Sequence, residues 1–552
     1  MITFDDVSLV HDGGRTVLSH VTVTVPAGEL TLVAGGTGAG KSTLLAMVDG
    51  LVPHFSAGRM TGEVTVDGRS TRTVRPRDMA DLVGYVAQDP AHGFVTSHVE
   101  SELAFSMEQR GVSPAAMRRR VEETLDLVGL ADLRDRPLRS LSLGQQQRVA
   151  LGAVLTASPQ VLVLDEPTSA LDPVGAEEVL AIVRRLVEDV GLTVVLAEHR
   201  LERVLHAADG VLYLPGDGSV RAGSAAGLLR GTSSAPPILR LADALGWDPA
   251  PLTVRAARPF ARELVRARVP ESPVPAQALH RAHPAYPARP VHPARPAQPA
   301  RALLEARSVD VSHGPVRAVR RVDLDLAPGE VVALMGRNGS GKSSLLWALQ
   351  GSGPRDRGTV LVDGTETSRT RPRRARELVA LVPQDVADLF FCETVDDECR
   401  AADTDAQAPT GTTRRLLDAM VPGLEGSTHP RDLSEGQRLA LALAVVLAVP
   451  AQVLLLDEPT RGLDYAAKGA LVAALRSLAH DGTAVVVATH DVELAADLAD
   501  RVVLMAQGEV VADGPAREML TASTGFAPQV AKVFAPHPWV RLSDVPGTEG
   551  AW

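Results

Sequence analysis

A glycine-rich segment occurs twice in the chain and indicates its fold. It is GGTGAGKST at residues 35–43 and GRNGSGKSS at residues 336–344, and both copies fit the phosphate-binding pattern G-x-x-x-x-G-K-[ST]. The chain has four lysines, and two of them, Lys41 and Lys342, stand in these loops. Arginine supplies most of the remaining positive charge. Lysine is therefore specifically required here, as a compact ammonium that reaches the β- and γ-phosphates.

The similarity between the two halves extends well beyond these loops. Lys342 follows Lys41 by 301 residues, and four further motif positions recur at spacings of 291 to 296 residues: Gln88 and Gln384, Ser142 and Ser434, Asp165 and Asp457, His199 and His490. An ordered set of motifs at a nearly constant offset indicates tandem copies of one domain. We therefore predict an α/β chain of two tandem P-loop NTPase domains.

Hydropathy patterning places strands and helices around the first loop. Residues 21–25 and 64–66 alternate between apolar and polar side chains and predict antiparallel strands. The short apolar run 30–34 leads into the glycines, and residues 42–48 have helical character, which is the strand–loop–helix context that the loop requires. The apolar runs 161–164 and 193–197 predict buried parallel strands. Residues 99–155 between them are mostly helical in pattern.

Composition divides the chain into four parts. We expect a first domain at residues 1–230, an appendage and linker at 231–301, a second domain at 302–525, and a loose tail at 526–552. The appendage includes a predicted helix at residues 238–247. From about residue 271 the linker is rich in proline, alanine and arginine and has little to bury. It is predicted to be an extended tether, with a proline-rich recognition segment as the alternative.

Charge and composition narrow the class of protein. The chain has 552 residues, a formal net charge of −11 and 3% aromatic residues, which opposes a general nucleic-acid binder. Its two cysteines are interpreted as reduced thiols of a cytosolic protein. The start has no signal-peptide pattern. The longest apolar stretch, 439–456, is interrupted by Pro450 and Gln452 and predicts a buried helix followed by a buried strand. Work at a membrane therefore requires docking on another chain.

Two consecutive carboxylates end an apolar run in each copy. The sequences are VLVLDEPTSALD and VLLLDEPTRGLD, with Asp165 and Glu166 in the first and Asp457 and Glu458 in the second. At this distance from a phosphate loop, the aspartates are expected to hold Mg²⁺ through water. The glutamates are expected to orient and polarise the attacking water. The hydroxyls of the loop residues Ser42 and Ser343 complete the predicted magnesium sites.

A signature lies upstream of each carboxylate pair: LSLGQQQR at residues 141–148 and LSEGQR at 433–438. It resembles the signature of the ABC ATPases, which opens a helix whose N–H groups face the γ-phosphate bound to the opposite domain. Gln88 in YVAQDP and Gln384 in LVPQD resemble the family's Q-loop glutamine, which also serves the metal. Asp172 and Asp464 match its D-loop aspartate, and His199 and His490 match its switch histidine.

The resemblance implies a fold and a set of site residues for both copies. Each domain is expected to have a RecA-like, mostly parallel sheet, an antiparallel β subdomain and a helical subdomain. The catalytic candidates are Glu166, Glu458, His199, His490, Gln88 and Gln384. The magnesium candidates are Ser42, Gln88, Asp165, Ser343, Gln384 and Asp457. The ATP-binding candidates are Gly35, Gly36, Thr37, Gly38, Ala39, Gly40, Lys41, Ser42, Thr43, Gly336, Arg337, Asn338, Gly339, Ser340, Gly341, Lys342, Ser343, Ser344, Ser142, Gly144, Gln145, Ser434, Gly436, Gln437, His11 and His313.

The same resemblance implies that the two domains pair head to tail within one chain and enclose two ATP molecules. The first site is expected to use Ser434 and Gly436 from the second copy, and the second site Ser142 and Gly144 from the first. Two details depart from the family pattern. The adenine-stacking position, usually aromatic, is assigned to His11 and His313. The middle glycine of the signature is replaced by Leu143 and Glu435, and an acid near a phosphate weakens a site unless its side chain turns away. We expect two active sites, which need not be equal.

The segment after the first Q-loop suggests which process the ATPase drives. QDPAHGFVTSHVESELAFSMEQRGV, residues 88–112, resembles the ATPases of energy-coupling factor (ECF) transporters, in which a V-x-x-E-[LI]-A-F stretch is typical. The second copy keeps ETVDDE in LFFCETVDDEC. The resemblance implies a peripheral subunit at the cytoplasmic face of the cell membrane. Its partners would be a transmembrane coupling subunit and a substrate-capture subunit that import a vitamin or a transition-metal cation. The alternative for this segment is an amphipathic helix that packs only on its own domain.

Two other jobs stay open for a fused pair of ABC ATPases. A soluble translation-associated factor acting on ribosomes would have a long charged helical arm between its domains, whereas this connector is proline-rich and the chain is acidic. A sugar-type importer ATPase usually has one degenerate site, and neither carboxylate pair is broken here. No nucleic-acid partner is expected.

Overall fold

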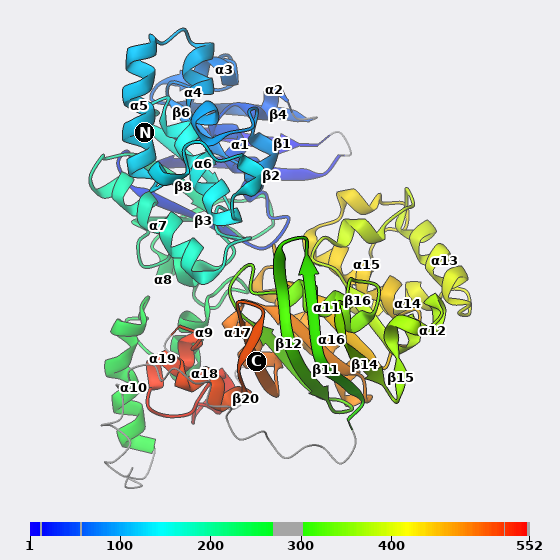
Figure 1. The fold of residues 1–552 in the computed structure, drawn as a ribbon. Helices are drawn as coiled ribbons and strands as arrows, with labels where there is room; N and C mark the ends of the chain where they lie inside the picture. Colours follow the sequence, from blue (N-terminus) through cyan, green and yellow to red (C-terminus); the bar gives the residue numbers. More distant parts are fainter. Residues whose placement is uncertain (12–13, 56–57, 269–301, 524, 549–552) are drawn as a thin grey trace. The chain divides into compact units, whose positions relative to one another are not determined.

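The computed structural model describes residues 1–11, 14–55, 58–268, 302–523 and 525–548. These residues form two compact units (Figure 1). Unit 1 comprises Met1–Asp243 with Asp464–Ala466, and unit 2 comprises Ala244–Leu463 with Ala467–Trp552.

Unit 1 is built on a six-stranded sheet in the order β10-β9-β3-β8-β7-β6. All neighbours are parallel except β10, which is antiparallel to β9. The central strands are buried along their whole length, which explains why they are continuous apolar runs in the sequence. The strands are β3 (Leu30–Gly35), β6 (Val83–Val86), β7 (Val161–Asp165), β8 (Thr193–Ala197), β9 (Gly210–Leu214) and β10 (Arg221–Gly223).

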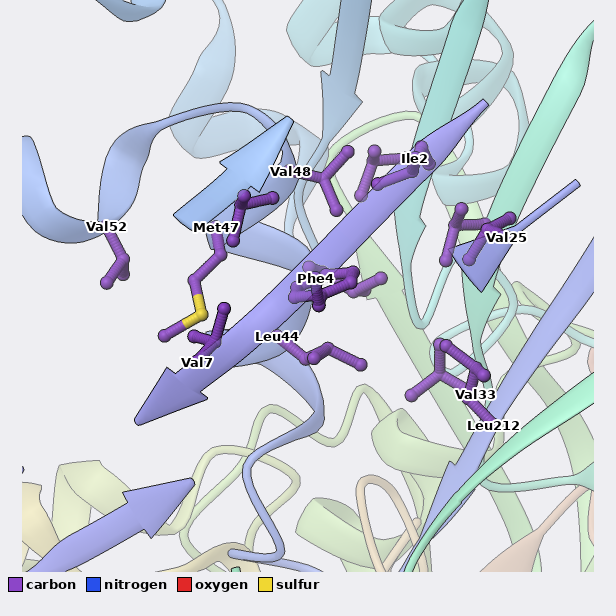
Figure 2. Close-up of a cluster of buried hydrophobic side chains, with 14 of the residues drawn as sticks. Ile2, Phe4, Val7, Val25, Val33, Leu44, Met47, Val48, Val52 and Leu212 are labelled. Atoms are coloured by element: carbon purple, nitrogen blue, oxygen red, sulfur yellow. The ribbon is translucent and has the colours of Figure 1, made fainter. Parts of the chain in front are cut away.

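A second sheet of unit 1 is antiparallel, in the order β2-β1-β4-β5, and confirms the strands expected from alternation. Its strands are β1 (Ile2–Val10), β2 (Thr16–Val25), β4 (Arg59–Val66) and β5 (Arg69–Ser70). Its inward side chains form one core with helix α1 (Lys41–Val48) and the parallel sheet (Figure 2). Phe4 at the centre is 1% exposed, and burying such a side chain stabilises the fold by roughly 1.5–3 kcal/mol. This core fixes the helix that follows the phosphate loop.

Helices complete unit 1. Three of them, α4, α5 and α6, pack around their own apolar cluster and form the helical subdomain. Helix α7 packs against α6 and β8, and its first residues follow the DEPTSALD segment. The bounds are α2 (Leu51–His54), α3 (Pro76–Met79), α4 (Val99–Gln109), α5 (Pro114–Leu127), α6 (Leu143–Leu155), α7 (Pro173–Glu188), α8 (Ala225–Leu229) and α9 (Pro237–Leu245).

Unit 2 repeats this topology. Its six-stranded sheet, β16-β17-β18-β13-β19-β20, and its four-stranded sheet, β12-β11-β14-β15, match those of unit 1 strand for strand. The α/β fold with two tandem domains is therefore confirmed. The strands are β11 (Leu304–His313), β12 (Val316–Leu326), β13 (Val331–Met335), β14 (Arg357–Val362), β15 (Thr365–Glu366), β16 (Val379–Val382), β17 (Val453–Asp457), β18 (Ala484–Thr489), β19 (Arg501–Ala506) and β20 (Glu509–Pro515).

The helices of unit 2 include counterparts of those in unit 1 and additions at both ends. The expected buried helix and strand at residues 439–456 are the end of α15 and the strand β17. The bounds are α10 (Val254–Arg268), α11 (Lys342–Gln350), α12 (Pro372–Leu378), α13 (Val395–Ala406), α14 (Thr412–Met420), α15 (Glu435–Leu447), α16 (Tyr465–His480), α17 (Val492–Leu498), α18 (Ala516–Ala522) and α19 (Gln529–Phe534).

The described part of the C-terminal segment, up to residue 548, is packed and not a loose tail, which corrects the expectation from its proline and glycine content. Helix α19 lies against α10, the helix that precedes the linker (Figure 1). Phe534 is 2% exposed and contacts the rings of Trp247 and Trp539, and Trp247 stacks on Phe260 at 5.4 Å between centroids. Aromatic rings are scarce in this chain, and here they join two segments almost 290 residues apart in sequence.

Two further predictions concern the region around the linker. The helix expected at 238–247 is present as α9, Pro237–Leu245. The predicted tether lies within residues 269–301, outside the described residues. Within the described ranges, no helix combines the length and the apolar character that crossing a bilayer requires.

Candidate active site

The first phosphate loop connects β3 to α1 and holds its lysine tightly. Lys41 Nζ donates to the carbonyl oxygens of Gly35 and Gly36, both at 3.0 Å. Burial lowers the pKa of Lys41, and the charge of Glu166 acts in the opposite direction. A buried ammonium whose bonds go to carbonyl groups of its own loop is ready to exchange them for phosphate oxygens.

Glycine is required at the start of each loop for a steric reason. A Cβ on Gly35 would lie 2.5 Å from the carbonyl oxygen of Leu214, and one on Gly336 would lie 2.4 Å from that of Met505. Both contacts are to backbone of the neighbouring strand, which cannot move aside. The loop therefore turns directly against the sheet, and its N–H groups precede the helix N-terminus that favours anions.

The second loop has the same path with one added contact. Lys342 Nζ donates to the carbonyl oxygens of Gly336 at 2.9 Å and Arg337 at 3.2 Å. It also lies 3.8 Å from Glu458 Oε1, so the lysine and the candidate catalytic carboxylate form an ion pair. The loop lysine of unit 2 is therefore linked directly to the carboxylate that follows β17.

The aspartates at the ends of β7 and β17 occupy equivalent environments. Burial raises the pKa of Asp165, and a hydrogen bond from the Ser42 side chain partly offsets this effect. Burial likewise raises the pKa of Asp457, with Ser343 in the offsetting role. In each aspartate the Oδ1 atom is buried without a hydrogen-bond partner. An unpartnered buried carboxylate oxygen beside a serine hydroxyl fits a bound Mg²⁺, which prefers few protein oxygens together with phosphate and water.

The first candidate base, Glu166, is held by two other predicted site residues. Its carboxylate accepts a hydrogen bond from Gln88 Nε2 at 3.1 Å and pairs with His199 Nε2 at 2.7 Å. Glu166 has φ +49°, an unusual backbone conformation that Glu458 shares. Such positions cost of order 1–3 kcal/mol and are retained where the surrounding structure fixes them. The structure thus brings together the glutamine, glutamate and histidine that the sequence predicted for this site.

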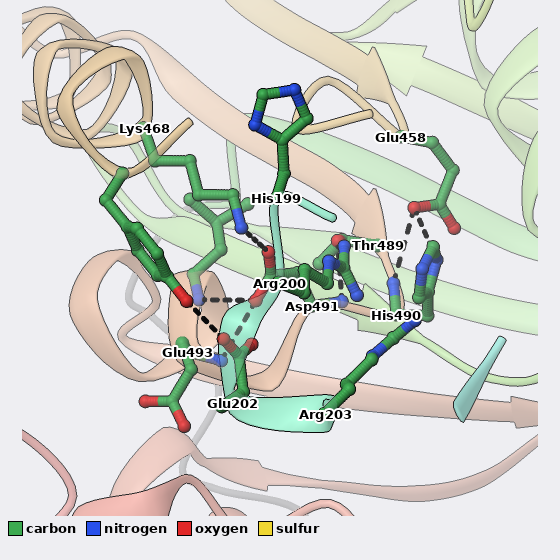
Figure 3. A network of polar contacts seen from close by, with 12 residues as sticks. His199, Arg200, Glu202, Arg203, Glu458, Lys468, Thr489, His490, Asp491 and Glu493 are labelled. Carbon is green, nitrogen blue, oxygen red and sulfur yellow. Dashed lines mark hydrogen bonds and ion pairs between the residues drawn. The ribbon is translucent and has the colours of Figure 1, made fainter. Parts of the chain in front are cut away.

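The second candidate base, Glu458, is held differently (Figure 3). It pairs with His490 through the other ring nitrogen, Nδ1, at 2.8 Å, and it accepts the backbone N–H of His490 at 3.4 Å. Gln384 is exposed, as Gln88 is. The histidine and the carboxylate meet in both units, but through different atoms.

The two signatures begin helices with the same cap. Ser142 accepts from the N–H of Gln145 at the start of α6, and Ser434 accepts from that of Gln437 at the start of α15. The side-chain oxygen of each glutamine in turn accepts the backbone N–H of the serine, which completes a capping box in both units. The remaining N–H groups of these first turns, including that of Gly436, form the kind of helix N-terminus that binds anions.

Glu435, the acid in the second signature, is balanced by a cation one turn later. Its Oε1 lies 2.9 Å from Arg438 Nη1, and Arg438 also donates to the carbonyl oxygens of Arg431 and Leu433. A Cβ on Gly462 would come within 2.9 Å of the Glu435 stem, so glycine makes room for it. The acid that the sequence analysis identified as a liability therefore has a local partner.

Asp172 and His313 were also predicted to be site residues, and each makes a specific contact. Asp172 caps α7 by accepting from the N–H of Gly175 at 2.8 Å. His313 Nε2 lies 3.0 Å from Ser344 Oγ, which places it beside the second phosphate loop. The stacking roles of His11 and His313, and the pairing of each signature with the other unit's phosphate loop, stay predictions.

Two site residues were missed by the sequence analysis. Tyr85 donates to Asp165 Oδ2 at 3.4 Å, and burial raises the pKa of Tyr85. Glu198, immediately before His199, is buried beside the DEPTS segment. The sequence did contain a signal for both residues, because the second copy has different residues, Leu381 and Thr489, at the corresponding positions.

Comparison with known proteins fits this geometry. The family described as ABC transporter matches residues 18–169 and 319–461. A protein of Streptomyces avermitilis, named as an ABC transporter ATP-binding protein, is 56% identical over 99% of this chain and 99% of its own. One of Methanosarcina mazei with the same description is 32% identical over 96% of this chain and 92% of its own. A solved structure of ribosome-bound archaeal Pelota and ABCE1 aligns with 94% of this chain and 80% of that chain, at 21% identity and a TM-score of 0.60, which shows likeness of fold alone.

Two P-loops, each with its own carboxylate pair, signature and switch histidine, define a tandem P-loop ATPase. The chain belongs to the ABC transporter family as an ATP-binding protein with two ATPase domains, and it hydrolyses ATP.

Proposed function

We propose that this chain is the twin ATPase of an ECF-type importer. It would sit at the cytoplasmic face of the membrane and drive uptake of a vitamin or a transition-metal cation. A separate transmembrane coupling subunit and a substrate-capture subunit would be its partners. The naming of its relatives as ABC transporter proteins supports the general role. The observation that carries the more specific proposal is the V-x-x-E segment after each Q-loop.

The glutamate of this segment shapes the loop in front of its own helix. Glu102, 5% exposed, accepts from the N–H groups of Val95 at 3.1 Å and Thr96 at 2.7 Å, and from the Thr96 hydroxyl at 2.8 Å. In unit 2, Glu398 accepts from the N–H groups of Phe391 and Cys392. Because a buried carboxylate with several N–H donors fixes a loop firmly, both segments present the same short turn to solvent.

Each turn exposes one apolar side chain at the corresponding position. Val95 is 64% exposed in unit 1 and Phe391 is 88% exposed in unit 2. Phe391 stands at the rim of a groove of about 380 Å³, whose other apolar lining residues include Leu381, Leu389, Ala401, Val445, Val446 and Val449. An exposed aromatic ring beside an apolar groove suits an amphipathic helix from a partner.

The residue roles are proposed from the geometry and the family. Lys41 and Lys342 bind the phosphates. Ser42 with Asp165, and Ser343 with Asp457, would hold Mg²⁺, which neutralises phosphate charge when bound. Glu166 and Glu458 polarise the attacking water, and His199 and His490 orient those carboxylates. These assignments give the chain two catalytic centres, one at each phosphate loop.

Co-purification in detergent tests the transport proposal. A tagged full-length chain is expected to retain a multi-span membrane protein from its own membranes. Phe391→Asp and Val95→Asp should each reduce that recovery at least about fivefold, because a charge on the docking surface is costly to desolvate. Val316→Asp is the matched control, since Val316 is 62% exposed in unit 2 but lies on β12, outside the groove.

A different outcome would favour the alternative of a translation-associated twin ATPase. If no membrane protein is retained and the chain co-sediments with ribosomes instead, the importer proposal fails. Unchanged recovery with both Asp variants would show that the V-x-x-E turns are not the docking surface.

A further inference from the structure

We propose that Glu198 is a positioning residue of the first ATPase copy, which fixes His199 against Glu166. The second copy has no counterpart of this device. The proposal rests on the roles proposed above for Glu166 and His199. It concerns a residue outside the predicted site, and it makes the two ATP sites chemically unequal.

The Glu198 carboxylate joins two loops that carry the proposed catalytic groups. Glu198 is 1% exposed and directly follows β8. Its Oε1 accepts from the backbone N–H groups of His199 at 2.9 Å and Arg200 at 3.3 Å. Its Oε2 accepts from the hydroxyl of Thr168, two residues beyond Glu166, at 2.5 Å. One side chain therefore ties the loop that carries the histidine to the loop that carries the glutamate.

A nearby arginine supports this arrangement. Arg203 Nη1 donates to the carbonyl oxygen of Thr168 at 3.2 Å and to its hydroxyl oxygen at 3.3 Å. A buried carboxylate is costly unless charge and hydrogen bonds compensate it. Three hydrogen-bond donors compensate the Glu198 carboxylate, and the bonds from Arg203 to Thr168 direct the Thr168 hydroxyl proton toward Glu198. Such a satisfied polar network favours a single geometry of the two loops.

The second copy lacks both ends of this network. Thr489 stands at the position of Glu198, and Leu494 at that of Arg203. Thr489 accepts from the N–H of Asp491, and Leu494 is buried in the core. Asp491 caps α17, whereas the same segment of unit 1 forms only the 3₁₀ turn Leu201–Arg203. The two replacements occur together, as expected if Glu198 and Arg203 act as one network.

The contacts of His199 and His490 differ as expected if Glu198 acts in unit 1 alone. In unit 1 the backbone N–H of His199 is bound to Glu198, and the ring reaches Glu166 through Nε2. In unit 2 the N–H of His490 bonds to Glu458 itself, and the ring uses Nδ1 (Figure 3). In unit 1 Glu198 thus accepts the histidine N–H, whereas in unit 2 the corresponding N–H bonds to the candidate base. Misplacement of a catalytic group by about 1 Å can cost on the order of 100-fold in rate, so the arrangement matters for the chemical step.

The test measures single-turnover hydrolysis by the full-length chain in a Glu458→Gln background, so that the first copy dominates. Glu198→Thr imports the residue of the second copy and is expected to lower the rate constant about tenfold, with the apparent KM for ATP changed less than about twofold. Glu198→Gln should keep at least about half the rate, because its amide oxygen still accepts the two N–H groups and its amide nitrogen can bond the Thr168 hydroxyl. Glu188→Thr, an exposed change on α7, is the control.

Two results would overturn the proposal. One is a Glu198→Thr rate equal to that of the control. The other is a Glu198→Gln rate as low as that of Glu198→Thr, which would show that negative charge, and not positioning, is what Glu198 supplies. Thermal unfolding of each variant checks that the fold is intact. Glu166→Gln in the same background keeps the two proposals separate, because an undiminished rate there would refute the role of Glu166 and leave the Glu198 comparison readable.

Discussion

The two ATPase copies share a topology and differ in how they hold the glutamate that is proposed to activate water. In unit 1 Glu166 is bonded to Gln88 and His199, and Glu198 keeps the histidine backbone away from it. In unit 2 Glu458 accepts the backbone N–H of His490, lies 2.8 Å from the Nδ1 atom of its ring and lies near Lys342. Duplication therefore preserved the chemistry of each site, while the hydrogen-bond partners of the glutamates diverged.

The largest expected effect tests whether both copies work. Glu166→Gln and Glu458→Gln should each reduce hydrolysis at the altered site by about 100-fold or more, because general-base assistance contributes 10²- to 10⁴-fold. Steady-state kcat of the single variants is the measurement, and the larger fall is expected for Glu166→Gln. If one variant keeps full turnover, its copy binds nucleotide without hydrolysing it. Glu188→Gln on the exposed side of α7 is the control.

The second prediction uses the aromatic cluster of unit 2, which has no counterpart among the described residues of unit 1. Phe534→Ala removes a fully buried ring from the contact between α10 and α19, and a loss of about 3 kcal/mol in unfolding free energy is expected. Urea denaturation followed by tryptophan fluorescence measures it, since Trp247 and Trp539 contact this ring. Phe55→Ala, at a position 78% exposed, should change stability by less than about 0.5 kcal/mol. Equal effects of the two variants would mean that the segment is a separable tail after all.

The third prediction exploits a titratable group that only the first copy has. Burial raises the pKa of Asp49, after the last turn of α1, to about 7, and the second copy has Gln350 at this position. Because the folded pKa lies above the ordinary carboxyl value, the proton stabilises the fold. That contribution is full below about pH 4 and is lost as the pH rises through 7.

Asp49→Gln should therefore stabilise unit 1 at pH 8, by on the order of 2 kcal/mol, and have little effect at pH 4.5. The difference in unfolding midpoint between variant and native chain, followed from pH 4.5 to 8, is the measurement. A difference that does not depend on pH would contradict the raised pKa of this carboxyl.

The smallest expected effect concerns the signatures. Glu435→Leu removes an acid whose charge Arg438 already balances, so the KM for ATP should change less than about twofold. Leu143→Glu places the same acid in the first copy, where Gln146 replaces the arginine, and should raise the KM about two- to fivefold. ATP titrations of steady-state hydrolysis compare them. Equal shifts in both variants would show that Arg438 does not neutralise Glu435.

Local sequence signals determined most of the architecture and the identity of the site. A glycine loop between an apolar strand and a helix, followed by a strand ending in Asp-Glu, constrains the backbone strongly enough to be recognised residue by residue. The duplication added confirmation, since each motif could be checked against its copy. The helix α10 was missed because Pro259 interrupts its pattern, although Ala257 and Ala261 mark a buried face.

Which side chains share a hydrogen-bond donor or line the same cavity depends on the assembled fold. The packing of α19 on α10 joins segments separated by the whole second copy, and no local pattern encodes such a contact. Likewise, Glu198 and Thr168 are thirty residues apart and meet because β7 and β8 are neighbours in the sheet. The order of the amino acids specified the chemical groups and the strands and helices that carry them. Their hydrogen-bond partners, and hence the inequality between Glu166 and Glu458, depend on distances that arise only when the strands are assembled.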